Sequence, residues 1–357
     1  MRDELRSGRR RFLGAGAAAL GAAALGQAAC AAFRLPDEGP LPSLAGATGW
    51  LNGGPPAAQE LRGRVVLVDF GTYTCINWLR TLPHIRAWDA RYRDHGLVVV
   101  GVHTPEFGFE RDADNVRRAL EARRLRWPMA LDANQAVWNA FDNHYWPAVY
   151  VADGRGRIRY HRFGEGEYEW MESVVRRLLA EAGVADPGGE AVPEEGAGIE
   201  AEADWGSLLS PENYVGYART ANFASSEGGP LPDTPAVYEV PPRLALGQWA
   251  LSGSWTVGRE AAVANAAGGR IACRFHARDL HLVMHPPARG GAARFRIRLD
   301  GRPPDGAHGL DADASGEGRV SEPRLYQLVR QPKPVAERTF EIEFLEPGVE
   351  VYAFTFG

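Results

Sequence analysis

Two continuous apolar runs constrain the fold of this chain more than any other feature. They are RVVLVDF at residues 64–70 and LVVVGVH at residues 97–103. Short unbroken runs of this kind are typical of strands that are buried on both faces. Between them, residues 76–93 carry large apolar side chains at helical spacing. The order strand, helix, strand predicts an α/β sandwich in which helices cover both faces of a mixed sheet.

The rest of the first half continues this pattern. Residues 112–124 form a second expected helix, PAVYVADGRGRIRYHRF contains two expected strands joined by a turn at Asp153 and Gly154, and residues 167–182 form a last helix. We therefore expect an α/β domain at residues 32–185.

The pattern changes after a segment rich in Gly, Pro, Ala and Glu, which we interpret as an exposed acidic linker at residues 186–208. Beyond it, FRIRLDGR and TFEIEF alternate apolar and charged residues, as half-buried strands do. Residues 209–357 are therefore expected to form an all-β antiparallel sandwich of the jelly-roll kind.

The N-terminus predicts export. Residues 1–31 combine a charged start with an uncharged run of Ala, Gly and Leu that is weakly hydrophobic for a membrane span. Arg9 and Arg10 resemble the twin-arginine export signal, which predicts a periplasmic or other extracytoplasmic location. An uncleaved membrane anchor is the alternative. Cys30 follows a partial lipoprotein box and is a candidate lipidation site, so membrane contact is expected only through the signal or a lipid anchor.

Charge and spacing argue against several other classes of protein. The net charge is −5 and no basic stripe follows the N-terminus, so nucleic acid is not an expected partner. The spacing of His, Cys, Asp and Glu matches no zinc or iron site, and we expect no metal or cofactor.

A set of motifs in the first half carries a family resemblance. VVLVDF is followed by Cys75, by Pro83 within the expected helix, and by Pro147 before a later strand. This arrangement resembles the exported redoxin branch of the thioredoxin fold. TYTCIN-LRTLP, GVHTPEF, FDNHYWPAVYV and HRFGEGEYE further resemble the thioredoxin-like part of DipZ-type proteins. The resemblance implies that Pro147 is a cis-proline facing the Cys75 sulfur, whereas the alternative for Trp146–Pro147 is an ordinary strand entry.

Cys75 is the candidate nucleophile. A thiol at a helix N-terminus faces unpaired backbone N–H groups, so we expect its pKa to be lowered. Dithiol enzymes carry a second cysteine at the i+3 position, which releases the mixed disulfide, but here that position is Trp78. Asp69 matches the buried acid that serves the second cysteine in thioredoxins. With that cysteine absent, Asp69 is either a relic or a group that tunes Cys75.

The surroundings of Cys75 are expected to be repacked. Where the family pattern has Trp, this chain has Gly71, and the ring lost there is matched by the ring gained at Trp78. Thr72, Thr74, Asn77, Trp78 and Trp146 complete the expected environment of Cys75. Thr72 also stands three residues before Cys75 as in peroxiredoxins, which keeps a one-cysteine peroxidase as an alternative. Glu106, in GVHTPEF, has no physical role that the sequence reveals.

The second half resembles the C-terminal domain of DipZ-type proteins through PENYVGYAR, QWALSGSWTVG, EPRLYQLVR and GVEVYAFTFG. Its architecture is similar to carbohydrate-binding modules, which makes a glycan a candidate ligand. Four aromatic residues are candidates for stacking on sugar rings, although core positions are favoured for them: Tyr214, Tyr217, Trp249 and Trp255. Cys273 alternates with Ile271 and Phe275 and is expected to be a buried, inert thiol.

Two main functions are consistent with these features. In the first, Cys75 forms mixed disulfides with protein thiols and disulfides or with a small thiol such as glutathione. In the second, the redoxin scaffold has lost turnover and binds client proteins or glycans. We favour the first because the residues that flank Cys75 are retained.

Overall fold

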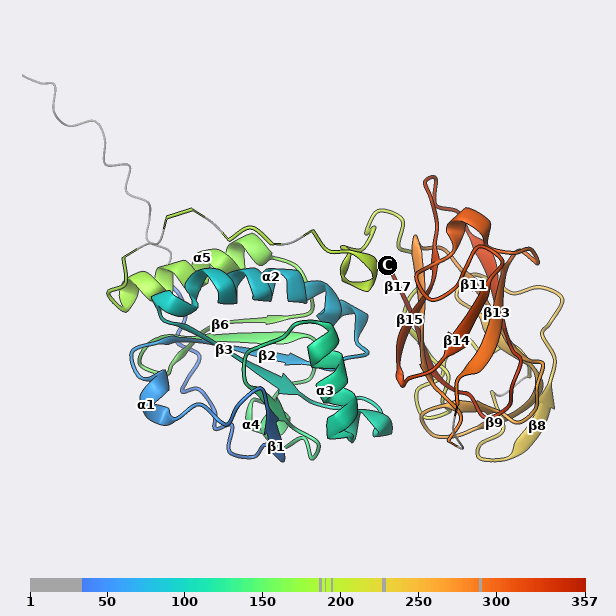
Figure 1. The fold of residues 1–357 in the computed structure, drawn as a ribbon, viewed down its shortest axis with the longest axis horizontal. Helices are drawn as coiled ribbons and strands as arrows, with labels where there is room; N and C mark the ends of the chain where they lie inside the picture. Colours follow the sequence, from blue (N-terminus) through green and yellow to red (C-terminus); the bar gives the residue numbers. More distant parts are fainter. Residues whose placement is uncertain (1–33, 186–187, 190, 194, 227–228, 289–290) are drawn as a thin grey trace, which may run out of the picture. The chain divides into compact units, whose positions relative to one another are not determined.

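A computed structural model describes residues 34–185, 188–189, 191–193, 195–226, 229–288 and 291–357 (Figure 1). Pro36–Gly357 form one compact unit. The expected signal at residues 1–31, including Cys30, lies outside the described residues. Among the residues that are described, no helix has the length and apolar character needed to cross a bilayer.

The first half is an α/β fold built on a six-stranded mixed sheet, as expected. The strand order is β1-β4-β3-β2-β5-β6, in which β2–β3 and β3–β4 are parallel and the other pairs are antiparallel. The strands are β1 (Gly49–Leu51), β2 (Val65–Gly71), β3 (Leu97–His103), β4 (Met129–Leu131), β5 (Ala148–Ala152) and β6 (Ile158–Phe163). The helices are α1 (Ala58–Leu61), α2 (Ile76–Tyr92), α3 (Ala113–Ala122), α4 (Ala136–Ala140) and α5 (Tyr168–Glu181), with 3-10 turns at Arg93–His95, Gly108–Arg111 and Gly198–Glu200.

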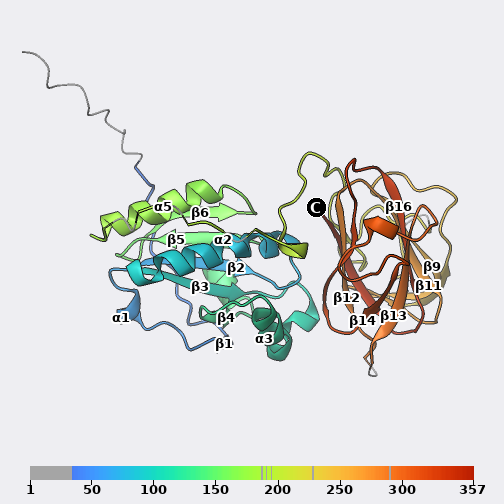
Figure 2. The ribbon, with the colours of Figure 1, turned by 45° about the horizontal axis from the view of Figure 1, so that its top comes forward.

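The central strand β2 positions the site. All seven of its residues are buried, because helices cover both faces of the sheet there. α2 and α5 lie side by side on one face (Figures 1 and 2), and α4 packs with β2 and β5 in a core on the other face. β2 ends at Gly71, and its chain continues through a short loop into α2.

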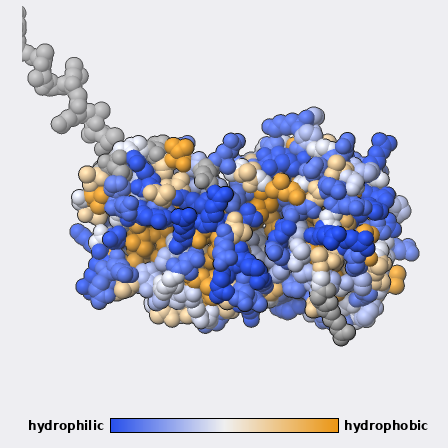
Figure 3. Space-filling view, in the orientation of Figure 1, coloured by the Kyte–Doolittle hydropathy of each residue, from blue (hydrophilic) through white to orange (hydrophobic). Residues whose placement is uncertain are grey.

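The second half is an antiparallel β structure, which confirms the expected class. Its main strands pair in the order β14-β13-β16-β11-β9-β10-β17-β12-β15, and the sheet curls around one shared core. The strands are β7 (Asn213–Tyr214), β8 (Pro235–Tyr238), β9 (Trp249–Val257), β10 (Ala262–Ala264), β11 (Gly269–Phe275), β12 (Asp279–His285), β13 (Ala293–Leu299), β14 (Glu317–Val320), β15 (Arg324–Arg330), β16 (Arg338–Phe344) and β17 (Glu350–Phe356), with a 3-10 turn at Asp305–Ala307. In β13 and β16 the apolar residues alternate inward while charged residues face outward. The face drawn in Figure 3 is accordingly mainly hydrophilic, and hydrophobic atoms appear on it in separate patches.

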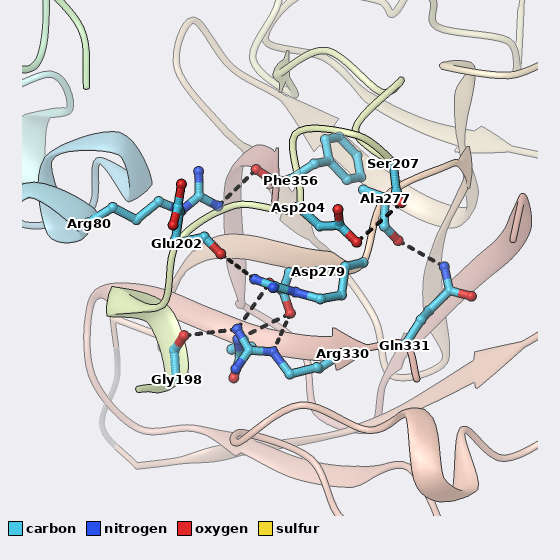
Figure 4. A network of polar contacts seen from close by, with 12 residues as sticks. Arg80, Gly198, Glu202, Asp204, Ser207, Ala277, Asp279, Arg330, Gln331 and Phe356 are labelled. Carbon is cyan, nitrogen blue, oxygen red and sulfur yellow. Dashed lines mark hydrogen bonds and ion pairs between the residues drawn. The ribbon is translucent and has the colours of Figure 1, made fainter. Parts of the chain in front are cut away.

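Arg80 joins α2 to the last strand of the second half. Its Nη2 donates to the carbonyl oxygen of Phe356 at 3.1 Å (Figure 4), and its Nη1 pairs with Glu165 at 3.2 Å. The side chains of Arg80 and Glu165 are only 2% and 7% exposed, so this ion pair lies inside the protein. The helix that begins beside Cys75 is therefore anchored to β17.

The expected linker is packed over part of its length, which corrects the expectation of an exposed segment. Ile199 is buried, and Glu200 pairs with Arg86 of α2 at 2.6 Å. The carbonyl oxygen of Gly198 accepts a hydrogen bond from Arg330, which also pairs with Asp279 (Figure 4). This stretch of an acidic, glycine-rich segment is therefore held by a buried apolar side chain, an ion pair and a backbone hydrogen bond.

Candidate functional site

Cys75 stands where the buried strand β2 gives way to α2. It is the residue that precedes the first turn of α2, and its carbonyl oxygen accepts the hydrogen bond from the Leu79 N–H at 3.0 Å. Cys75 itself is partly buried. Its Sγ lies 3.8 Å from the carbonyl oxygen of Trp146. The sequence-based placement of this thiol at a helix N-terminus is therefore correct.

The Trp146–Pro147 peptide is cis, as the resemblance implies. The Trp146 indole donates from Nε1 to the carbonyl oxygen of Thr104 at 3.0 Å and packs on Trp138 with ring centroids 4.3 Å apart. These contacts fix the chain that faces the sulfur. Cys75 and the Trp146–Pro147 pair, which lie far apart in the sequence, are thus brought together.

Trp78 occupies the space next to Gly71. Its side chain is 1% exposed, and a Cβ added at Gly71 would lie 2.2 Å from its Cδ1 and Nε1 atoms. Real carbon atoms do not approach so closely, so any larger residue at position 71 requires Trp78 to move. The exchange of a ring between positions 71 and 78 is thus consistent with the geometry.

Asp69 is bound to Trp78. The indole Nε1 donates to Asp69 Oδ2 at 2.9 Å, and the carboxyl group is fully buried. Burial raises the pKa of Asp69 to about 7, and the Trp78 hydrogen bond opposes this rise. Trp78 therefore stands at the i+3 position after Cys75 and is the hydrogen-bond partner of this acid.

The other expected neighbours of Cys75 have separate partners. The Thr74 hydroxyl donates to Glu110 Oε1 at 2.5 Å, and Thr72 Oγ1 lies 3.3 Å from His103 Nε2. The Asn77 backbone N–H faces the Cys75 sulfur. The Thr72 hydroxyl is thus engaged with an imidazole, and the structure adds no support for the peroxidase alternative.

The electrostatics of Cys75 differ from the expectation. The pKa of the thiol lies well above its ordinary value, because burial and then the charges of Glu106 and Glu212 disfavour the thiolate. The backbone N–H groups of Trp78 and Asn77 act in the opposite direction and are outweighed. The expected lowering of the Cys75 pKa is therefore wrong, because it counted the helix terminus without burial and without acids from elsewhere in the chain.

The second half contains a buried thiol and buried rings. Cys273 on β11 is 4% exposed, as expected, and burial raises its pKa. Cys75 and Cys273 are both free thiols. Trp249 and Trp255 are fully buried in the core and cannot stack on a sugar, which confirms the core alternative for these two.

Sequence reasoning missed a group of residues around Glu106. The Glu106 carboxylate accepts hydrogen bonds from the Tyr214 hydroxyl and from Arg219 Nη1, each at 2.7 Å. The backbone N–H of Glu106 donates to Glu110 at 2.6 Å. The motifs GVHTPEF and PENYVGYAR contain three of these four residues, but nothing in either motif indicates that the two meet.

The chain is similar to several known proteins. The family described as "Thioredoxin like C-terminal domain" matches residues 210–357. "Protein DipZ" of Mycobacterium bovis is 35% identical over 329 residues, which make up 91% of this chain and 44% of that protein. The chain thus spans less than half the length of this curated relative.

Two further similarities concern the first half. "Thiol-disulfide oxidoreductase YkuV" of Bacillus subtilis is 30% identical over 142 residues, which cover 40% of this chain and 95% of that protein. The solved structure "Solution Structure of a Thioredoxin-like Protein in the Oxidized Form" is 30% identical, covers 40% of this chain and 96% of that chain, and has a TM-score of 0.38.

Proposed function

Because the chain belongs to the thioredoxin-like family, we propose that it is an exported thiol–disulfide exchange protein in which Cys75 is the single reactive sulfur. The observation that carries this proposal is the placement of Cys75 at the start of α2, with its Sγ 3.8 Å from the Trp146 carbonyl oxygen beside the cis Trp146–Pro147 bond. A partner's disulfide can meet the sulfur there, because Cys75 is only partly buried.

The exchange proceeds in two balanced steps. In the first, the Cys75 thiolate attacks one sulfur of a partner disulfide, a mixed disulfide forms, and the other partner sulfur leaves as a thiolate. In the second, an external thiolate attacks the partner's sulfur in the mixed disulfide, a new disulfide forms between those two sulfurs, and Cys75 leaves as a thiolate. Cys75 is oxidised in the first step and reduced in the second by the incoming thiol.

The second step needs a thiol from outside the site. The i+3 position holds Trp78, whose indole is bonded to Asp69, and the remaining free cysteine among the described residues, Cys273, is buried in the core of the second half. Protein thiols, or a small thiol such as glutathione, are therefore the partners that complete the cycle. Asp69 retains no role in proton transfer to a second sulfur in this scheme.

Export rests on the sequence of residues 1–31, with Arg9 and Arg10 as the twin-arginine pair. A periplasmic or other extracytoplasmic location suits thiol–disulfide exchange, because disulfides persist in oxidising compartments. Lipidation of Cys30 would tether the protein to a membrane in the same compartment.

A client-binding scaffold remains the second candidate function, and the raised pKa of Cys75 favours it. A thiol that stays protonated attacks disulfides slowly, and such a domain would bind partners without exchanging with them.

The test is formation of a mixed disulfide by the purified mature protein with Cys273→Ser as background. Oxidised glutathione is added at about pH 9, where a raised pKa still permits reaction, and the intact mass is measured. We expect one glutathione adduct per chain, absent from the Cys75→Ser variant and removed by dithiothreitol. A chain that gains no adduct while remaining folded by circular dichroism would contradict the exchange function.

A further inference from the structure

Glu106 connects the loop after β3 to the second half of the chain. Its carboxylate, with a side chain 9% exposed, accepts from the Tyr214 hydroxyl and from Arg219. The Arg219 guanidinium also lies over the Tyr214 ring, 3.7 Å from the centroid. Residues 211–219 are therefore held against this loop by hydrogen bonds, an ion pair and a cation–π contact.

The Tyr214 hydroxyl bridges two carboxyl groups and has one proton to share between them. It lies 2.7 Å from Glu106 Oε1 and 3.0 Å from Glu212 Oε2. The single hydroxyl proton cannot form hydrogen bonds to two ionised carboxylates at once. Both carboxyl groups are therefore hydrogen-bonded to Tyr214 only when one of them carries a proton itself. Arg219 forms an ion pair with Glu106 at 2.7 Å, and Glu212 is the carboxyl group on the other side of the Tyr214 hydroxyl, where it can hold the additional proton.

The electrostatics of Glu212 agree with this proton count. Glu212 is exposed as a residue, and its carboxyl group accepts a hydrogen bond from the Tyr214 hydroxyl. Burial and the neighbouring Glu106 charge raise the pKa of Glu212 to about 7. Its charge therefore changes near neutral pH.

This group is coupled to the redox loop through Glu110. The Glu110 carboxyl group accepts from the Thr74 hydroxyl through one oxygen and from the Glu106 backbone N–H through the other. Thr74 immediately precedes Cys75. The charges of Glu106 and Glu212 both reach the Cys75 thiol and disfavour its thiolate.

We propose that Glu212, held by Tyr214 against Glu106, switches the charge beside Cys75 and so sets how firmly Cys75 keeps a mixed disulfide. When Glu212 is ionised, the Cys75 thiolate is disfavoured, so Cys75 is a poor leaving group and the mixed disulfide persists. When Glu212 is protonated, an incoming thiol displaces Cys75 more easily. The proposal rests on the proposed exchange function and makes the second half a working part of the redox site.

Several other titratable or charged groups face this cluster. They are Glu110 and Tyr73 from the first half and Arg219, Glu260, Glu350 and Tyr352 from the second. Among the largest influences on the Cys75 pKa, which are burial and then Glu106 and Glu212, the acid from the second half is Glu212. Glu260 therefore offers a matched control, since its Oε2 accepts from the Gly108 N–H at 2.9 Å on the same loop.

The experiment measures alkylation of Cys75 by iodoacetamide from about pH 6 to about pH 10, using the full mature chain with Cys273→Ser. Glu212→Gln mimics the protonated side chain. Near pH 6 the side chain at position 212 is uncharged in both proteins, because Glu212 of the parent is protonated and the variant carries an amide. We therefore expect the variant to react at the parent rate at that pH. Above about pH 8 we expect the variant to react about tenfold faster, which corresponds to a shift of about one unit in the Cys75 pKa.

Glu260→Gln removes the same charge from the same contact and should follow the parent across the whole range. The proposal is overturned if Glu212→Gln follows the parent at every pH, or if both variants react faster by the same factor at every pH, since the latter indicates a displaced contact.

Release of bound glutathione by dithiothreitol is measured in parallel and should be faster in Glu212→Gln only above about pH 7. Equal release rates there would overturn the effect on the mixed disulfide. Alkylation of Cys75 does not require disulfide exchange, so the two proposals can fail separately. An unchanged alkylation profile in Glu212→Gln contradicts the proposed role of Glu212. A missing glutathione adduct contradicts the exchange function.

Discussion

The contact between Trp78 and Gly71 predicts that two substitutions, each damaging alone, compensate each other. Gly71→Trp places a ring where a Cβ alone would lie 2.2 Å from Trp78. Overpacking of this kind costs about 3 kcal/mol of folding free energy. Trp78→Cys empties the space of a buried indole and removes the hydrogen bond to Asp69, for which about 4 kcal/mol is expected.

If the two effects were independent, the double variant would lose about 7 kcal/mol, which is a large part of the stability of an ordinary domain. In the compensated arrangement the ring at position 71 fills the space that the ring at position 78 vacates. We therefore expect the double variant to lose no more than about 3 kcal/mol, a coupling of about 4 kcal/mol.

Urea unfolding of the parent, the two single variants and the double variant measures this coupling. The far-ultraviolet helical signal reports on the first half, because α1 to α5 all lie there. Gly71→Ala is the control, since its Cβ clashes with the indole in the parent and this clash is absent in the Trp78→Cys background. Losses that simply add in the double variant would refute the repacking argument. If the coupling is found, the second sulfur introduced at position 78 should also allow the double variant to reduce disulfides without an external thiol.

Two further predictions concern buried charges. Arg80→Met should lower the free energy of unfolding by about 3 kcal/mol, because it leaves the buried Glu165 carboxylate unpaired and removes the bond to the Phe356 carbonyl oxygen. Adding Glu165→Gln should recover part of this loss in the same urea assay. An Arg80→Met variant as stable as the parent would contradict this prediction. The pKa of Asp69 is raised from 3.8 to about 7, so the folded protein keeps a proton that the unfolded chain releases, and stability should fall as pH rises from about 4 to about 7. Asp69→Asn should flatten that dependence by up to about 4 kcal/mol, and an unchanged slope in pH-dependent urea unfolding would show that the acid is not buried as described.

The backbone around Cys75 could be predicted from the sequence because its signals are local. The unbroken apolar run of β2 and the helical spacing in α2 are each contained in fewer than twenty neighbouring residues. Local patterns of this kind reflect burial and periodicity, which act along one element. The placement of Cys75 followed directly, since it is the residue immediately before α2.

The charge environment of Cys75 could not be predicted because it depends on residues that are distant in the sequence. Tyr214 lies 108 positions from Glu106, and no periodicity in either segment indicates their contact. The helix-terminus argument was correct for the backbone groups it considered, but burial and the acids Glu106 and Glu212 outweigh them. A pKa is the sum of all nearby charges, whereas a motif contains only those on its own segment.

The tight fit of Trp78 against Gly71 also bears on how this sequence can change over time. A sequence that gained a cysteine at position 78 by one substitution would carry an empty space, and one that first gained a ring at position 71 would carry a clash. Both intermediates are expected to be less stable than the present chain. Selection for stability therefore opposes each single-step path from this chain to a dithiol site, and this opposition acts as an evolutionary ratchet on the pairing of Gly71 with Trp78.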